Sequence, residues 1–252
     1  MAGVFLAFLL LPLLALIATS GPAQIIAAMG HPLVLPALRL SVVTSLLSLG
    51  ITLVFGTPLS WLLARRRGRV ARGMEVALEL PIVLPPAVIG VALLMAYGRR
   101  GWLGGFFDTV GFSAAFTPAA VVLAQILVAA PFYIQSATAA FRQIDEEILV
   151  VARTLGASPA RTFFKIAVPL ALPGLVNGAA MMWARSLGEF GATLFFAGNL
   201  THKTQTLPLA IYAALESDVR VAQTISILLL AIAVLLLAML RGPFTAWIGG
   251  AK

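Results

Sequence analysis

The chain has 252 residues, of which 61% are hydrophobic and only 10% are charged, and its net charge is +8. Soluble domains normally carry about 25% charged residues, so this composition excludes an ordinary soluble protein and predicts an integral membrane protein. The sequence contains no Cys and only two His, His31 and His202, which are far apart. A disulfide framework and a thiolate metal site are therefore excluded, and a histidine metal cluster is not expected.

The first apolar segment begins at Val4, and we expect its helix over about residues 4–20. Two interpretations are open. The small residues Ala18, Thr19 and Ser20 form a passable cleavage site for a signal peptide. However, a signal peptide carries positive charge before its apolar region, and no Lys or Arg precedes this one. We therefore favour a retained first helix.

The second apolar segment, about residues 40–64, ends directly at a cluster of arginines: Arg65, Arg66, Arg67, Arg69 and Arg72. Positive charge that abuts a spanning helix is typical of cytoplasmic loops, so the cluster predicts that this loop lies inside the cell. Nucleic-acid binding is the weaker interpretation, because no aromatic residues alternate with these arginines.

The third segment, about residues 76–97, contains three prolines, Pro81, Pro85 and Pro86. In a helix bundle the neighbouring helices can satisfy the carbonyls that prolines leave free, so we predict a kinked or interrupted helix. Arg99 and Arg100 follow at its outer end. The Gly- and Phe-rich stretch through residue 116 is expected to be a loop, partly re-entrant. The fourth segment, about 117–140, then returns the chain to the cytoplasm.

A polar stretch over residues 145–174 interrupts the apolar second half of the chain. Gly156 can adopt the left-handed conformation that ends a helix, Ser158 is a good N-cap, and Pro159 suits the first helical position. These residues predict a helix end followed at once by a short helix over about 159–165.

The short helix carries two adjacent aromatic residues, Phe163 and Phe164. Physical chemistry alone leaves two interpretations open. The helix either lies on the lipid surface or packs its aromatic side chains against another protein.

The fifth segment, about residues 170–196, contains Arg185 and Glu189, which are four residues apart and can pair on one helix face. Charge within a spanning helix normally faces the bundle interior or water, which makes the pair a candidate functional site within the membrane. A purely structural ion pair, or a charge that extends to the outer boundary of the membrane, is the alternative. A connection over 199–220 follows, and it holds His202 and Lys203.

With a sixth segment at about 221–240, both termini are expected in the cytoplasm. Eleven of the seventeen Lys and Arg then lie inside, five lie outside, and Arg185 lies within the membrane. This asymmetry is the one expected of a correct topology. The sequence thus predicts an all-α membrane protein with six transmembrane helices, a single domain over 1–252, and a cytoplasmic loop at about 145–169.

One motif resembles a known family. The run Ala152-Arg153-Thr154-Leu155-Gly156-Ala157-Ser158, then Phe163-Phe164, Val168-Pro169 and Leu172-Pro173, resembles the cytoplasmic loop of ABC importer permeases. In that family the loop contains the coupling helix, which docks into a cleft of the ATPase subunit. The family's usual Glu-Ala-Ala falls here on Val150-Val151-Ala152, so its acidic residue is missing. The resemblance implies an ATPase-docking role for Ala152, Gly156, Ala157, Ser158, Pro159, Ala160, Arg161, Phe163 and Phe164.

Residues 79–104, 184–199 and 206–212 are similar to the molybdate and tungstate permeases of this class, with sulfate permeases next closest. The resemblance implies a type I importer in the plasma (cell inner) membrane, with a second copy of this chain, two ATPase subunits and an extracytoplasmic molybdate-binding protein. ATP and Mg would be bound by the ATPase, because this chain has no phosphate-binding Gly-Lys-Ser/Thr loop. No cofactor, catalytic residue or nucleic acid is expected for this chain itself.

Candidate residues for the pathway or its gate are Pro85, Pro86, Arg185, Glu189 and Phe190. Arg99, Arg100 and Lys203 are candidates for guiding anions at the outer side. Two other classes of protein are less consistent with the sequence. A membrane-embedded enzyme would need a nucleophile or metal-ligand cluster that the sequence lacks. An ion-driven secondary transporter, with Glu79 and Glu189 as proton carriers, would have no use for the loop.

Overall fold

The computed structural model describes residues 1–19, 21, 26, 29–66, 68–109, 111 and 113–241, and within them all secondary structure is helical. Ser20 of the proposed cleavage site, Arg67 of the arginine cluster, and the tail 242–252 with its predicted cytoplasmic end lie outside this part.

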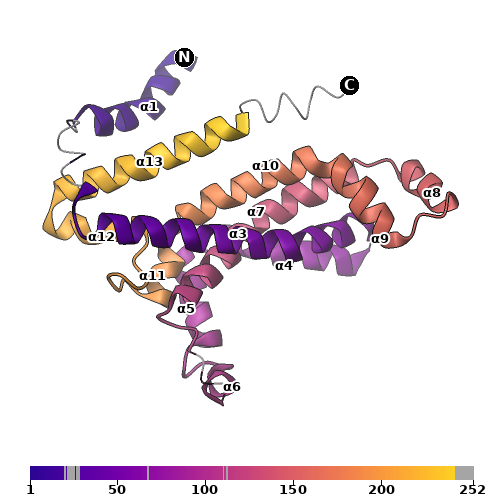
Figure 1. Cartoon of the computed structure of the whole chain (residues 1–252), viewed down its shortest axis with the longest axis horizontal. Coiled ribbons are helices and arrows are strands. Elements are labelled where there is room, and N and C mark those ends of the chain that lie inside the picture. Colours follow the sequence, from indigo (N-terminus) through magenta and orange to yellow (C-terminus); the bar gives the residue numbers. More distant parts are fainter. Residues whose placement is uncertain are drawn as a thin grey trace.

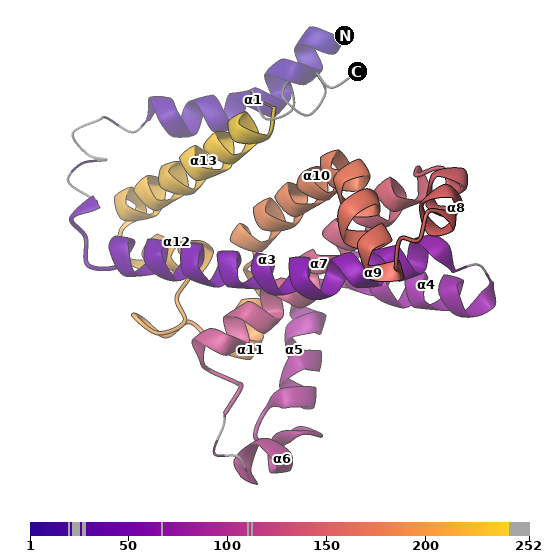
Figure 2. The ribbon, with the colours of Figure 1, turned by 45° about the vertical axis from the view of Figure 1, so that its right-hand side comes forward.

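Three long helices form the centre of the molecule: α3 (Val34–Arg65), α7 (Pro118–Arg142) and α10 (Val168–Leu187). They run alongside one another in both views of the ribbon (Figures 1 and 2). Their main apolar core includes Tyr133, Phe141 and Met182.

The face of α3 toward its neighbours is made of small hydroxyl residues rather than large apolar ones. Ser41, Thr44, Ser45 and Ser48 are all buried. The hydroxyls of the last three donate to backbone carbonyls one turn earlier, which satisfies them inside the helix itself. In membranes, small residues of this kind let helix backbones approach closely.

The predicted third segment is interrupted. α4 (Arg69–Val83) and α5 (Pro86–Tyr97) meet at an angle of 114°, with Leu84 and Pro85 extended between them. Pro85 and Pro86 have no N–H with which to continue the hydrogen bonds of α4, so the helix stops there. This confirms the interruption, although α4 begins at Arg69, well before the expected start at residue 76.

α5 leaves the bundle and packs against α11 (Gly191–Ala197), with the short helix α6 (Gly104–Thr109) at its far end (Figure 2). The stretch between α5 and α7, which was expected to be a loop, therefore contains a helical turn. Phe106 and Phe107 of α6 contact each other, and Phe107 also contacts Tyr97 at the end of α5.

The remaining helices are α1 (Ala2–Ala18), α12 (Leu207–Ser217) and α13 (Val219–Arg241). α12 lies in the connection 199–220, for which no helix was expected. Its first turn is fixed to α3, because the backbone N–H of Leu207 donates to the buried hydroxyl of Ser41 at 2.7 Å.

Four helical stretches in the described residues are long and apolar enough to cross a membrane, and the bent pair of α4 and α5 would make a fifth. α1 is apolar but has only 17 residues. The structure thus confirms an all-α, multi-spanning chain, whereas the count of six spans, the position of the termini and the single domain over 1–252 stay predictions.

Two expected helix boundaries were wrong. α9 (Pro159–Thr162) is not a separate loop helix: it continues through η1, a π-helical turn (Phe163–Ala167), directly into α10. Pro169 has no N–H to donate to the carbonyl of Lys165, and such gaps favour a local widening of the helix. The fifth span is consequently one 29-residue stretch, Pro159–Leu187, and α11 is a separate helix rather than its end.

Candidate functional site

The loop between α7 and α10 projects beyond the bundle and is built by two capping motifs (Figure 1). Asp145 caps α8 (Glu146–Thr154), because its Oδ1 accepts from the backbone N–H of Glu147 at 3.0 Å. Gly156 ends the helix with φ = +84°, the left-handed conformation that the sequence predicts. The Ser158 hydroxyl then accepts from the N–H of Arg161 at 3.3 Å and begins α9.

The two adjacent aromatic residues of this loop have different environments. Phe163 points into the protein: its ring lies 5.7 Å from that of Trp61 and 6.1 Å from that of Phe141. Phe164 is 66% exposed. Phe163 is half-buried against α3 and α7, so of the two rings Phe164 is the one fully presented at the surface, and a docking role for Phe163 stays a prediction.

Most other candidates in the loop lie on its surface. Gly156, Ser158, Pro159, Ala160 and Arg161 are exposed, and Ala157 is half-buried. Ala152 is only 8% exposed and faces inward beside Leu149, so its side chain is not available to a partner. Leu149 and Ala152, the two buried residues of α8, are three positions apart, a spacing that places them on one helix face and that the sequence could have revealed.

The structure adds apolar surface that the motif did not assign. Ile148, Val151 and Leu155 are exposed on α8 and just beyond its end, and Leu155 reaches 82%. Phe164 on η1 is exposed as well. We call these four exposed apolar residues of the projecting loop the docking surface.

The pair Arg185–Glu189 exists, but not for the reason expected from its spacing. α10 ends at Leu187, so the two residues do not share a helix. Glu189 lies in the break before α11, where its Oε2 is 2.9 Å from Nη2 of Arg185 and its Oε1 accepts from the N–H of Ala192 at 2.8 Å. Glu189 is 1% exposed, whereas Arg185 is half-buried.

The broken end of α10 has a second support. Ser186 in its last turn has a carbonyl that accepts from Nε2 of the buried Gln125 on α7 at 3.2 Å. Sequence reasoning missed Gln125. A buried amide on an otherwise apolar helix was the available signal, since such groups are normally hydrogen-bonded.

Other pathway candidates meet at the same break. A Cβ on Gly191 would lie 2.8 Å from Cβ of Pro86, so α5 and α11 touch through their first residues. Phe190, between Glu189 and α11, packs its ring 5.6 Å from that of Tyr212 on α12. The structure therefore brings Pro86, Glu189 and Phe190 to one place, with Pro85 adjacent in the chain.

The three candidates for guiding anions are on different parts of the chain. Arg99 and Arg100 are exposed in the turn between α5 and α6, and Lys203 is exposed in the turn between α11 and α12. These turns lie at separate places in Figure 1. The structure does not gather the three residues into one cluster.

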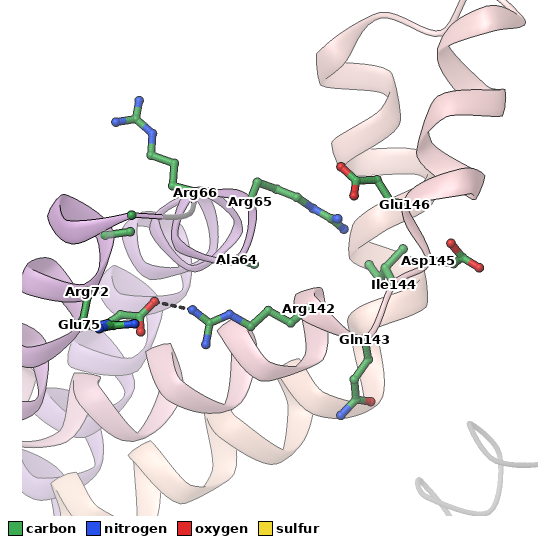
Figure 3. A pocket seen from close by; sticks show the side chains of 12 residues that line it. Ala64, Arg65, Arg66, Arg72, Glu75, Arg142, Gln143, Ile144, Asp145 and Glu146 are labelled. Carbon is green, nitrogen blue, oxygen red and sulfur yellow. Dashed lines mark hydrogen bonds and ion pairs between the residues drawn. The ribbon is translucent and has the colours of Figure 1, made fainter.

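A cleft of about 850 Å³ lies where α3 and α7 end and where α4 and α8 begin (Figure 3). Its charged lining residues are Arg65, Arg66, Arg72, Glu75, Arg142, Asp145 and Glu146. Arg142 is ion-paired with Glu75, and Arg65 extends across the cleft in the direction of Glu146. We call this the arginine cleft. Sequence reasoning found its arginine cluster but not the contribution of Arg142 and Glu75.

The described residues contain no cluster of His, Cys, Asp and Glu that could hold a metal ion. What the arrangement offers is a projecting apolar surface, a broken helix held by a buried ion pair, and a basic cleft. These are features suited to moving and binding rather than to covalent chemistry.

Residues 56–248 match the family described as the inner membrane component of binding-protein-dependent transport systems. The chain belongs to this family. It is therefore a multi-pass protein of the inner membrane and a transport component rather than an enzyme, as the sequence predicts.

The individual relatives of this chain include permeases for molybdenum and a probable permease for sulfate. The molybdenum transport system permease protein ModB of Mycobacterium tuberculosis is 46% identical over 199 residues, which cover 79% of this chain and 75% of that protein. ModB of Escherichia coli is 36% identical over 211 residues, 83% of this chain and 92% of that protein. The probable sulfate transport system permease protein cysT of Chlorokybus atmophyticus is 35% identical over 205 residues, 80% and 72% of the two chains.

Two solved transporters share the fold. A chain of the inward-facing MetNI methionine ABC transporter matches with a TM-score of 0.67 and 20% identity, over 87% of this chain and 96% of that one. A chain of the bacterial alginate ABC transporter in complex with an alginate pentasaccharide-bound periplasmic protein gives a TM-score of 0.71 and 16% identity, over 94% and 88%. The predicted fold class, that of a type I ABC importer permease, is confirmed.

Proposed function

We propose that this chain is the permease subunit of an ATP-driven importer that carries molybdate, or the similar oxyanion tungstate, across the inner membrane. The observation that carries the proposal is the 46% identity to a molybdenum permease over 199 residues, against 35% to a probable sulfate permease over 205. Sulfate is also a tetrahedral dianion, so it is the competing substrate.

The docking surface would transmit the energy of ATP hydrolysis to this chain, because the ATPase subunits would bind there. Since this chain has no phosphate-binding loop, two separate ATPase subunits would bind ATP and Mg. Phe164, Leu155 and Val151 are exposed at the projecting end of the chain and would fill an apolar cleft on the ATPase. Burial of each large apolar side chain contributes about 1.5–3 kcal/mol of favourable free energy, enough for a few residues to dominate the contact.

A second copy of the chain would complete the pathway. One side of α10 packs on α3 and α7, while Asn177, Met181 and Ala184 form an exposed stripe along its other side. These residues recur at intervals of four and three, so they share one face. A homodimer would bring two such faces together around a central pathway.

Alternating access would then follow from movement of the two copies. ATP-driven closure of the ATPases pulls on the docking surface, and α9 passes the movement on because it is continuous with α10. Arg185 and Glu189 lie at the other end of α10, at the break with α11. The break, with Pro85, Pro86 and Phe190 beside it, is where the pathway would open and close.

Tight binding would reside outside this chain, in an extracytoplasmic molybdate-binding protein. Arg99, Arg100 and Lys203 are exposed and separate, an arrangement suited to weak attraction of anions rather than to a closed site. Weak attraction also suits transport, because a site that held a dianion strongly would slow its release.

The test is to purify this chain with the candidate ATPase and measure ATP hydrolysis in liposomes. We expect copurification, and we expect molybdate-loaded binding protein added outside the liposomes to stimulate hydrolysis. Transport driven by an ion gradient without any ATPase would contradict the proposal and would favour a secondary transporter.

A further inference from the structure

The proposed function leaves the arginine cleft without a role. We propose that this cleft binds the phosphate group of an anionic phospholipid, with the headgroup held between the end of α3 and the end of α7. Three features support this assignment: how the arginines are held, which charges remain unpaired, and where the cleft lies.

Arg65 is held in place before any ligand arrives. Its guanidinium stacks 4.5 Å from the centre of the Trp61 ring, and its Nη2 donates to the carbonyl of Phe141 at 3.1 Å. Its Nε is buried and has no hydrogen-bond partner within the described residues, so the donors that a ligand can reach are those of the two Nη atoms. A guanidinium fixed in this way offers its remaining donors as a rigid fork, which matches the oxygens of a phosphate.

The acidic residues of the cleft are largely engaged. Glu75 is paired with Arg142. Asp145 uses its Oδ1 to cap α8, and its side chain points away from the cleft in Figure 3. Among the described residues neither Arg66 nor Arg72 has an ion-pair partner. Only Arg65 extends toward Glu146, whereas the Arg66 side chain points away from it (Figure 3), so the lining holds four arginines against three acidic residues. The cleft thus holds an excess of positive charge that an anion would neutralise.

The position of the cleft indicates that the bound anion is a lipid phosphate. α3 and α7 are both long enough to cross the membrane, and they end at Arg65 and Arg142. The cleft therefore lies at the ends of two helices of membrane-spanning length, on the side that the arginine cluster assigns to the cytoplasm. Basic pockets between such helices on the cytoplasmic side typically bind anionic headgroups. A free oxyanion has the same tetrahedral chemistry, but only lipid phosphate is concentrated there by the bilayer itself.

The experiment is native mass spectrometry of the full chain released from nanodiscs that contain phosphatidylglycerol and phosphatidylcholine. The wild-type protein should retain phosphatidylglycerol preferentially. The variant Arg66→Gln/Arg72→Gln should lose about tenfold of that retention, since each arginine near a charged membrane surface contributes measurably to binding. Arg69→Gln removes the same charge from the same loop but outside the cleft lining, so it should behave as the wild type.

Two further measurements distinguish a lipid site from misfolding and from a site for a free oxyanion. Arg66→Lys/Arg72→Lys keeps both charges, so it should fold and retain an intermediate amount of lipid, because Lys offers no planar fork. Millimolar phosphate or molybdate should not displace the lipid. Equal retention of the two lipids, unchanged retention in the Gln variant, or displacement by free phosphate or molybdate would each overturn the proposal, and the last would assign the cleft to a free oxyanion.

Discussion

Nη2 of Arg185 lies 2.9 Å from Oε2 of Glu189 across the break between α10 and α11, and the two residues differ in exposure. Glu189 is buried, and its other oxygen caps the first turn of α11. Arg185 is partly exposed. The Glu189 carboxylate therefore depends on the ion pair to balance its buried charge, whereas the Arg185 guanidinium has access to the surface.

We expect Arg185→Gln to destabilise the protein more than Glu189→Gln. Removal of Arg185 leaves a buried carboxylate without its counter-charge, which costs about 3–5 kcal/mol. Glu189→Gln keeps an oxygen for the N–H of Ala192, and Arg185 can turn outward, so about 1–3 kcal/mol is expected. Thermal unfolding in detergent measures both. The reverse order of stability would contradict the assigned roles, and the double variant Arg185→Gln/Glu189→Gln should be more stable than Arg185→Gln.

The two aromatic residues of the docking loop should separate coupling from folding. Phe164→Asp should weaken association with the ATPase without lowering the unfolding temperature, because an unpaired carboxylate is costly in an apolar cleft but not on an exposed surface. Phe163→Asp should lower the unfolding temperature, since its ring packs on Trp61 and Phe141.

Pull-down of the ATPase beside unfolding curves gives both quantities. Phe164→Leu is the control that keeps apolar surface and should keep association. A Phe164→Asp variant that binds the ATPase as the wild type does would remove Phe164 from the docking surface.

The contact between α5 and α11 should tolerate no added methyl group. A Cβ on Gly90 would lie 2.7 Å from Cβ of Phe195 and 2.8 Å from the carbonyl oxygen of Ala192. Gly90→Ala should therefore destabilise the protein by about 1–3 kcal/mol. Gly50→Ala on α3, where nothing lies within 4 Å, is the matched control and should leave the unfolding temperature unchanged or slightly higher. Equal curves for the two variants would contradict this packing.

The end of α8 depends on a backbone conformation rather than on a contact. Gly156 has φ = +84°, and a methyl group added there would meet no atom within 4 Å. Gly156→Ala therefore adds only backbone strain, about 1–2 kcal/mol. Gly156→Asn should cost less, because Asn adopts this conformation more readily. Hydrogen exchange of the α8 amides is the measurement, and faster exchange is expected for the Ala variant only.

Local signals in the sequence predicted the docking loop well. Gly156, Ser158 and Pro159 act within one or two turns of their own position, so their capping roles follow from residue type alone. The same is true of Pro85 and Pro86. Because they have no N–H groups, they end α4 regardless of which helices lie beside it.

Features that depend on neighbouring helices were not accessible in this way. The burial of Phe163 is decided by Trp61 and Phe141, which lie on α3 and α7 far away in the sequence. The break after Leu187 depends on Gln125 and on the capping of α11 by Glu189, so spacing alone suggested one continuous helix. The sequence did not predict α12, because a polar connection followed by a Pro is also typical of a loop. The hydrogen bond that fixes the first turn of α12 is accepted by Ser41, which lies far away in the sequence.

The most direct test of the central claim is uptake of radiolabelled molybdate, tungstate and sulfate by proteoliposomes that contain this chain, its ATPase and its binding protein. We predict ATP-dependent uptake of molybdate and tungstate, with sulfate carried poorly. Preference for sulfate would contradict the assigned substrate, and ATP-dependent uptake of a cation, a sugar or an amino acid instead would contradict the transport of an oxyanion altogether.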